Sequence, residues 1–232
     1  LWVDYNLMTT IPGLYAIGEC NFSDHGANRL GASALMQGLA DGYFILPYTI
    51  GDYLAHDIQT PKIRTNTPEF DAAEKNVTDH LRRLYDIKGT KSPDHFHKEL
   101  GHIMWDYIGM AREAEGLKKA IKLIAELKEE FYKDLRVTGE FTAMNNELEK
   151  AGRVADFIDI AHLMALDALD RNESCGGHFR LESVTEEGEA KRDDEHFQYV
   201  SVWEYKGENK EPEMYKEPLV FENIQVAQRS YK

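Results

Sequence analysis

The residues best suited to chemistry lie near the start of the chain, around one acid and one arginine. Glu19 follows a short apolar run, Leu14 to Ile17, which ends at Gly18 and predicts a buried strand closed by a tight turn. Open α/β sheets bind nucleotide cofactors just past such strand ends. Arg29 lies in the Gly- and Ala-rich stretch that follows, and its planar guanidinium matches the two oxygens of a carboxylate.

A helix is expected directly after this stretch. Ser33 is a favourable N-cap residue, and Gly31 and Ala32 before it leave the first backbone N–H groups of the helix accessible. Together with the helix dipole, these groups attract negative charge. The segment therefore predicts a site for an anionic ligand and a cofactor. Spacing alone leaves alternatives open, because no complete Gly-x-Gly-x-x-Gly is present, the arginine could pair with Asp24, and the acid could be an ordinary loop glutamate.

Other candidate side chains have simpler interpretations. His25 could bind substrate or orient Arg29, but a hydrogen-bonded structural histidine is the more common case. Cys175 and His178 could form a nucleophilic pair or half of a metal site, yet no second pair of ligands accompanies them, which favours a packed loop. The chain has only two cysteines, so we predict neither a disulfide framework nor a metal site.

Composition and length exclude several classes of protein. A net charge of −14 over 232 residues argues against nucleic-acid binding and against electrostatic docking on anionic lipid. There is no run of about 20 apolar residues and no signal peptide, so we expect no direct insertion into a membrane. The chain starts at Leu1 without Met, and its first strand has no preceding βαβ unit to pair with. We therefore expect a C-terminal fragment of a larger protein.

The elements that must position these residues begin with a helix from about Ala34 to Ile50. This run is apolar nearly all round, which predicts a helix that is deeply buried in the whole protein, whereas in a fragment much of its apolar surface would lack its cover. Pro47 predicts a kink or break near Phe44. Residues 57–66 form a linker.

Several amphipathic helices are expected next. Thr67-Pro68-Glu69 and Ser92-Pro93-Asp94 each predict a helix start, with Gly89 ending the first of these helices. The second of these helices is expected to run over about 93–114, and further helices are expected after Gly116 and over about 145–172. The last two have apolar stripes at helical spacing: Leu117, Ala120, Ile121, Ile124, Leu127 and Phe131, then Leu148, Ala151, Ala155, Ile158, Ala161, Ala165 and Leu169.

The end of the chain has a different character. Residues 173–180 read as a loop, and residues 182–195 as an acidic, solvated segment. Alternation predicts a strand over 199–205, and Leu219-Val220-Phe221 predicts a second strand that pairs with it.

Three strings of residues resemble one family. Gly13-Leu-Tyr-Ala-Ile-Gly-Glu19, followed by His25-Gly-Ala-Asn-Arg-Leu-Gly31, is similar to the flavoprotein subunit of succinate dehydrogenases and fumarate reductases. Glu173 to Arg180 with Arg192-Asp193-Asp194 resembles the family's Glu-Ser-Arg-Gly-Ala-His-x-Arg and Arg-Asp-Asp, although Cys175 stands where Arg is usual. Met104-Trp105, with Gly109 and Arg112, resembles a third family motif.

The resemblance and the helical periodicity together predict a mainly α fold. An antiparallel helical bundle of three to four helices is preceded by the tail end of an FAD-binding α/β domain and followed by a small β-containing C-terminal segment. We expect residues 1–56 to be the remnant of the FAD-binding domain, 57–172 the bundle, and 173–232 the C-terminal loop and β-hairpin segment.

The resemblance also implies roles for residues near the start of the chain. Arg29 is the catalytic candidate and holds a carboxylate of succinate or fumarate, with the backbone near Ala32 and the side chain of His25 also facing substrate. Glu19 contacts the nucleotide part of FAD. Backbone N–H groups of Ala34 and Leu35 stabilise negative charge on the flavin. The family's Asn-Ser before the helix is Ser33-Ala34 here, which removes those side-chain contacts.

The activity implied is flavin-dependent dehydrogenation, with hydride passing between succinate and FAD. The implied partners are an iron–sulfur subunit and a membrane anchor subunit, and the implied location is cytoplasmic, peripheral on the inner face of the membrane. Further catalytic residues would lie upstream, so this chain alone is expected to be inactive and to bind FAD poorly or not at all. The alternatives are an L-aspartate oxidase-like flavoenzyme, against which the Arg192-Asp193-Asp194 string argues, and a non-catalytic helical interaction domain.

Overall fold

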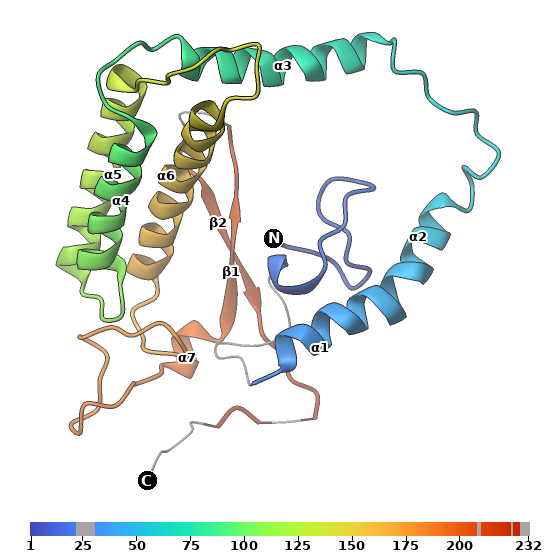
Figure 1. Ribbon diagram of the computed structural model, residues 1–232. Helices are drawn as coiled ribbons and strands as arrows, with labels where there is room; N and C mark the ends of the chain where they lie inside the picture. Colours follow the sequence, from blue (N-terminus) through green and yellow to red (C-terminus); the bar gives the residue numbers. More distant parts are fainter. Residues whose placement is uncertain (22–30, 208–209, 224, 228–232) are drawn as a thin grey trace. The chain divides into compact units, whose positions relative to one another are not determined.

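The computed structural model describes residues 1–21, 31–207, 210–223 and 225–227 of the chain (Figure 1). The chain divides into two compact units, residues 1–64 and 65–232, which are described separately below as unit 1 and unit 2. The described part is mainly helical with one two-stranded sheet, as the sequence predicts. No helix in the described part is long and apolar enough to cross a membrane.

Unit 1 does not contain the strand predicted over residues 14–17. Pairing in this region is limited to an isolated bridge between Met8 and Tyr15, with the Ala16 N–H donating to the Leu7 carbonyl at 3.0 Å. Ala16 is buried, but Leu14 is half exposed. A strand extends only as far as a neighbouring segment supplies backbone partners, and the described residues of this unit supply them over a few positions.

The first long helix is divided into three pieces. Helix α1 spans Ser33–Ala40, a π-helical turn spans Asp41–Ile45, and α2 spans Leu46–Leu54. The break near Phe44 and the place of Pro47, in the first turn of α2, confirm the prediction from proline.

The expected N-cap was wrong: the N-cap of α1 is Ala32, with φ +65°, in place of Ser33. Much of the apolar surface of the helix lacks cover, as expected for this part of the protein alone, since Leu35 is 79% exposed and Phe44 is 74% exposed. Because the apolar residues surround the whole helix, the described residues of unit 1 can cover only part of them.

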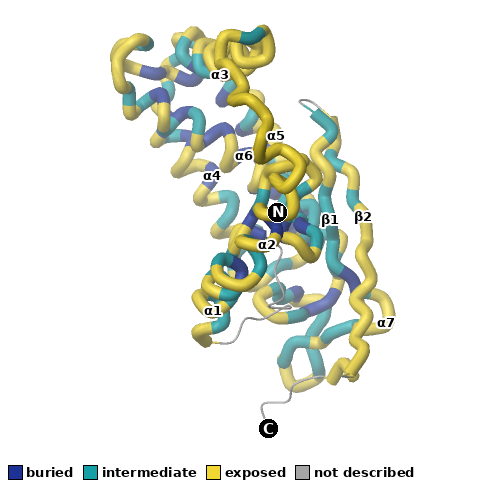
Figure 2. Tube along the Cα trace, turned by 90° about the vertical axis from the view of Figure 1, so that its right-hand side faces the viewer, coloured by how far each residue is buried: buried dark blue, intermediate teal, exposed yellow. Residues whose placement is uncertain are grey.

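Unit 2 is built on four helices (Figure 1): α3 (Pro68–Tyr85), α4 (Pro93–Ile108), α5 (Ala114–Asp134) and α6 (Asn146–Asp170). Helices α4, α5 and α6 pack side by side with short connections, which gives the antiparallel bundle, and α3 contacts α6. Figure 2 shows the buried positions along the facing sides of α4, α5 and α6. They include Phe96, Leu100, Ile108, Leu117, Ala120, Ile124, Leu127, Phe131, Leu148, Ala151, Val154, Ala155, Ile158, Ala161, Ala165 and Ala168.

The helix starts were predicted more accurately than the helix ends. Ser92 caps α4 by accepting from the His95 N–H, and Asn145 caps α6 by accepting from two N–H groups. In contrast, the helix expected over about 93–114 ends at Ile108. The next helix was expected to begin after Gly116, but this glycine lies inside α5. The two helices are separated by residues 109–113. Within this segment the Arg112 N–H donates to the Phe179 carbonyl of a distant loop, so it does not continue the helical hydrogen bonding of α4.

Gly89 does not end α3, whose C-cap is Asp86. A Cβ at Gly89 would lie 2.1 Å from the backbone carbon of Asp134, so the position is glycine because two backbone segments touch there.

After α6 the chain forms a loop, a short helix α7 (Asp194–Phe197) and the antiparallel strands β1 (Tyr199–Glu204) and β2 (Glu213–Pro218). Tyr199 pairs with Pro218 and Trp203 with Met214. The first predicted strand is confirmed. The second predicted strand, Leu219 to Phe221, was wrong, because β2 ends at Pro218. The connection between the two strands is shorter than expected, so residues 213–218 pair with β1.

Candidate functional site at the η1 turn and helix α1

The described part of the predicted site lies in unit 1, between a single 3₁₀ turn and the first helix. The turn, η1, spans Gly18–Cys20, and α1 follows after residue 32. Glu19, Ala32, Ala34 and Leu35 belong to these two elements. His25 and Arg29 lie in residues 22–30, outside the described residues.

Glu19 occupies the middle of η1, on the surface of the unit. The turn begins at Gly18, whose φ of +68° belongs to the left-handed region that favours glycine. A glutamate held on an exposed turn presents its carboxylate oxygens as acceptors, which suits the hydroxyl groups of a ribose.

The N-terminus of α1 forms the second half of the site. Ala32 has a left-handed backbone, and its carbonyl accepts from the Met36 N–H at 3.2 Å. The N–H groups of the first turn, including those of Ala34 and Leu35, have no carbonyl four residues earlier within the helix. They point toward whatever lies before the helix and favour negative charge there.

The described residues fit an FAD-like group. A side chain at Gly31 would meet no atom of the described residues within 4 Å, so small residues leave the described approach to the helix N-terminus open. The side chain of Leu35 is 79% exposed and offers apolar surface beside these N–H groups. A dinucleotide with a flat ring requires a carboxylate that accepts hydrogen bonds, N–H groups that donate them and an adjacent apolar surface. The described residues supply all three.

Three polar residues that the sequence analysis did not single out hold η1 against α1. Asp41 accepts from the Gly18 N–H at 2.9 Å through Oδ2. Asn21, just after the turn, donates to the Ala16 carbonyl at 3.2 Å and accepts from Gln37 Nε2 at 3.2 Å. A signal was available, because Asp41 is the one acid within the apolar run from 34 to 50.

The pair Cys175 and His178 lies in unit 2 and forms a tight turn. Each backbone N–H of the pair donates to the carbonyl of the other residue, at 2.9 and 3.1 Å. The imidazole contacts Arg112 and the Arg171 carbonyl. Burial, followed by the nearby Glu173 carboxylate, raises the pKa of the Cys175 thiol, which opposes formation of a nucleophilic thiolate. Among the described residues, no cluster of His, Cys, Asp and Glu could hold a metal ion.

Other buried polar groups in this loop have structural partners. Arg180, which is 2% exposed, donates to the Ala168 carbonyl at 2.9 Å and to Glu182 at 3.1 Å. Burial alone would raise the pKa of Glu182, but hydrogen bonds from Arg180 and the Ala114 N–H lower it to about 2. This network joins the end of α6 to the start of α5.

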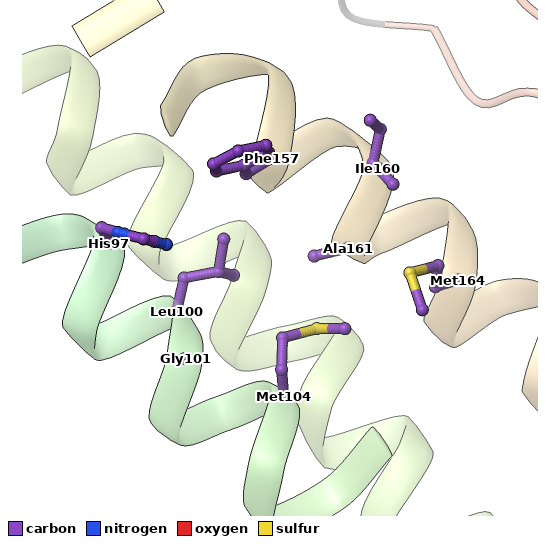
Figure 3. Close-up of a pocket in the computed structure, with 8 residues that line it drawn as sticks. All are labelled: His97, Leu100, Gly101, Met104, Phe157, Ile160, Ala161 and Met164. Carbon is purple, nitrogen blue, oxygen red and sulfur yellow. The ribbon is translucent and has the colours of Figure 1, made fainter. Parts of the chain in front are cut away.

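A groove of about 230 Å³ lies between α4 and α6 (Figure 3). Its lining is His97, Leu100, Gly101, Met104, Phe157, Ile160, Ala161 and Met164. The lining is apolar except for His97, whose ring packs against Phe157 with centroids 5.6 Å apart. A binding site for chemistry needs converging polar groups, and this groove does not provide them.

Comparison with known proteins places these elements in one family. Residues 97–231 match the family model described as the C-terminal part of fumarate reductase flavoproteins, and residues 1–35 match an FAD-binding domain. The fumarate reductase flavoprotein subunit of Haemophilus influenzae is 32% identical over 230 residues, which is 99% of this chain and 36% of that protein. The succinate dehydrogenase flavoprotein subunit of Bacillus subtilis is 32% identical over 180 residues, 78% of this chain and 30% of that protein.

A solved structure of E. coli quinol fumarate reductase shares the fold, with a TM-score of 0.83 and 27% identity over 98% of this chain and 37% of that one. The chain thus spans about a third of the length of these relatives. The L-aspartate oxidase of Synechocystis is a more distant relative, at 28% identity. From the match over 97–231 and the similarity across nearly the whole chain, we conclude that this chain belongs to the family of fumarate reductase and succinate dehydrogenase flavoproteins.

Proposed function

We propose that the whole protein is an FAD-dependent oxidoreductase that interconverts succinate and fumarate. One observation carries the proposal: the segment that matches an FAD-binding domain is the one that forms η1 and the start of α1. There an exposed acid and a helix N-terminus with small flanking residues lie on consecutive elements. We also propose that residues 1–56 complete the FAD-binding domain, that 57–172 form the helical bundle and that 173–232 form the C-terminal segment.

In this proposal the described residues bind and orient the cofactor. Glu19 accepts hydrogen bonds from the ribose hydroxyls of the nucleotide. The backbone N–H groups of Ala34 and Leu35 donate toward negative charge, and the dipole of α1 adds to their effect. Bound FAD supplies the hydride acceptor or donor for the reaction. The chain's own residues hold it in place.

The substrate side of the proposal rests on residue chemistry. Arg29 is permanently charged and can hold one carboxylate of succinate or fumarate through two parallel hydrogen bonds. The Ala32 backbone lines the same end of the substrate, and His25 orients the arginine or contacts the substrate. A dicarboxylate held in this way has its central C–H bonds fixed relative to the cofactor, which is the main requirement for hydride transfer.

We propose an iron–sulfur subunit and a membrane anchor subunit as partners. The support comes from the names of related structures, which include a quinol–fumarate reductase with menaquinol molecules and a mycobacterial Sdh1 complex. An oxidoreductase that exchanges electrons with a quinone needs a route between its own site and the membrane. The protein would accordingly lie on the cytoplasmic face of the membrane, attached through its partner subunits.

The test is to express the whole protein and to record its visible spectrum and its succinate- and fumarate-dependent dye reaction. A yellow protein whose turnover falls at least about 100-fold in Arg29→Ala, while FAD stays bound, would support the proposal. Asp24→Ala is the matched control, because it removes a neighbouring charge without removing the guanidinium. Turnover with L-aspartate in place of succinate would favour the L-aspartate oxidase alternative, and a colourless protein would favour a non-catalytic helical module.

A further inference from the structure

We infer that Asp41 is a positioning residue, which fixes the turn carrying Glu19 against helix α1 and so keeps the two halves of the cofactor site in one geometry. The inference rests on the proposed function only in its final step, the effect on FAD. Its structural part concerns the hydrogen bond between Asp41 and Gly18 and does not depend on the proposed function.

The Asp41 carboxylate is buried and has a defined partner. The residue is 5% exposed, and its Oδ2 accepts the Gly18 N–H at 2.9 Å across 23 positions of sequence. Burying a carboxylate is unfavourable unless it is hydrogen-bonded, and a hydrogen bond to a charged acceptor is stronger than a neutral one. The Gly18 N–H depends on this acceptor, because Gly18 is the first residue of the turn: its carbonyl accepts from the Asn21 N–H at 3.2 Å, whereas its own N–H takes no part in the bonding of the turn.

A second attachment lies on the other side of the turn. Asn21 is 7% exposed and ties the end of η1 to both Ala16 and Gln37, the latter on α1. Between the two attachments Gly18 faces Gly38, and a Cβ on Gly18 would lie at an ordinary contact distance of 3.8 Å from the Gly38 Cα. The turn is therefore held at its first residue by Asp41, which follows α1, and just after its last residue by Gln37 of α1.

The helix is modified where Asp41 stands. Asp41 opens the π-helical turn, and its carbonyl accepts from the Leu46 N–H, five residues later. Single π-helical turns inside α-helices occur frequently at functional sites. The wider turn follows directly after α1, which carries Ala34 and Leu35 about two turns before Asp41. One side chain thus links the acid-bearing turn to the helix whose N-terminus faces the cofactor.

The direct test is hydrogen exchange on the whole protein without added FAD, comparing wild type, Asp41→Ala and Asp41→Asn. We expect the amides of residues 18–21 to exchange about tenfold faster in Asp41→Ala. Asp41→Asn keeps an acceptor oxygen and should stay within about threefold of wild type. Thr49→Val is the matched control, since Thr49 is also buried in unit 1 and donates to the Ile45 carbonyl at 3.2 Å, within the adjoining helical segment.

Exchange at residues 46–54 of α2 separates positioning from general stability. Loss of protection in η1 alone would support the inference. Loss of protection in both η1 and α2 would show that Asp41 merely stabilises unit 1, and unchanged exchange in η1 would show that the hydrogen bond does not hold the turn. Either of these last two results would overturn the inference.

FAD binding provides the final step. We expect Asp41→Ala to weaken FAD binding about tenfold, and the double variant with Glu19→Gln to bind no more than about twofold weaker than the weaker single variant. Additive losses would show that Asp41 does not act through the turn carrying Glu19, and would overturn the inference while leaving the proposed function intact. A wild-type protein that takes up no FAD would overturn the proposed function, and the exchange experiment would still decide the role of Asp41 in the turn.

Discussion

The Nδ1 atom of His178 lies 2.8 Å from a terminal nitrogen of Arg112, and this contact joins segments 66 residues apart. Arg112 follows α4, where its Nε donates to the Ile108 carbonyl at 3.0 Å. On the other side of the ring, Nε2 lies 2.7 Å from the Arg171 carbonyl at the end of α6. A carbonyl only accepts, so Nε2 carries the proton and Nδ1 accepts from Arg112. Neutral imidazole is the form that makes both hydrogen bonds.

We predict that acid weakens unit 2 partly through His178. Burial lowers the pKa of His178 below its ordinary value of 6.5, and the charges of Arg112 and Arg180 lower it further. Between the folded and the ordinary pKa, the unfolded chain binds more protons than the folded one. The stabilisation is therefore fully present above a pH of about 6.5 and is lost as the pH falls through the folded pKa. Urea unfolding at several pH values between about 5 and about 8 measures this loss.

The control variants separate His178 from other groups. His178→Asn keeps an accepting oxygen near the Nδ1 position and has no titration in this range, so its stability should depend less on pH than that of wild type. The pKa of His196 is raised, mainly by its hydrogen bond with Asp193, so its effect on stability has the opposite sign. His196→Asn should keep the acid-side loss. Identical pH profiles for wild type and His178→Asn would contradict the prediction.

Arg180 should be the most sensitive charged residue of the loop after α6. Its guanidinium is almost fully buried and donates to the Ala168 carbonyl, so it satisfies carbonyls that the helix end leaves without partners. We expect Arg180→Met to lower the free energy of unfolding by about 3 kcal/mol, because it leaves these buried acceptors unsatisfied. Arg180→Lys should not restore it, since an ammonium cannot reach the carbonyl and Glu182 together.

The matched control is Arg153→Met on the outer face of α6. Arg153 is 67% exposed in its side chain and pairs with Glu149 one turn earlier. Exposed pairs of this kind contribute less than about 0.5 kcal/mol. Urea unfolding of all three variants provides the measurement, and equal losses for Arg180→Met and Arg153→Met would refute a special role for the buried guanidinium.

The bundle could be predicted because its information is local. The apolar stripe of α5, from Leu117 to Phe131, has helical spacing, and the structure buries most of it. The start of α6 follows from a side chain that caps its own helix, Asn145, which accepts from the Leu148 N–H at 3.1 Å. Such features depend on residues within a turn or two of each other.

The features that were predicted wrongly or missed depend on residues that are distant in the sequence. Gly89 was expected to end a helix, but its reason for being glycine is contact with Asp134, 45 positions later. The strand over 14–17 was expected from composition, yet backbone partners decide whether a strand forms. Asp41 was missed as part of the site because its partner, Gly18, precedes it by 23 residues. Periodicity contains no information on such pairings.

Gly89 should tolerate no side chain. A Cβ there would lie 2.1 Å from both the backbone carbon and the carbonyl oxygen of Asp134, and the Gly89 N–H donates to the Leu135 carbonyl at 2.8 Å. Moving the two segments apart would break that bond, so Gly89→Ala should cost about 3 kcal/mol of unfolding free energy.

A second glycine provides the opposite expectation in the same measurement. Gly152 lies inside α6, and a Cβ there would meet no atom within 4 Å in the part of the chain that the structure describes. Gly152→Ala should stabilise the protein by about 0.5–1 kcal/mol, because alanine loses less conformational freedom in a helix. Thermal or urea unfolding would show the contrast, and a mild effect of Gly89→Ala would mean that the two backbone segments are not in contact.

Ala32 should connect backbone strain to cofactor binding. Its φ of +65° costs an alanine about 1 kcal/mol, which a glycine does not lose. Ala32→Gly should therefore unfold at a slightly higher urea concentration and keep FAD in the whole protein.

Ala32→Val places a β-branched side chain in the same backbone region, where it is strongly disfavoured. It should reposition the start of α1 and lower FAD occupancy at least about tenfold, measured from the visible absorbance per protein. Ala55→Val, just after α2 and away from η1 in the sequence, is the matched control and should leave FAD occupancy unchanged. Retention of FAD by Ala32→Val would show that the left-handed backbone before α1 is not needed for the cofactor site.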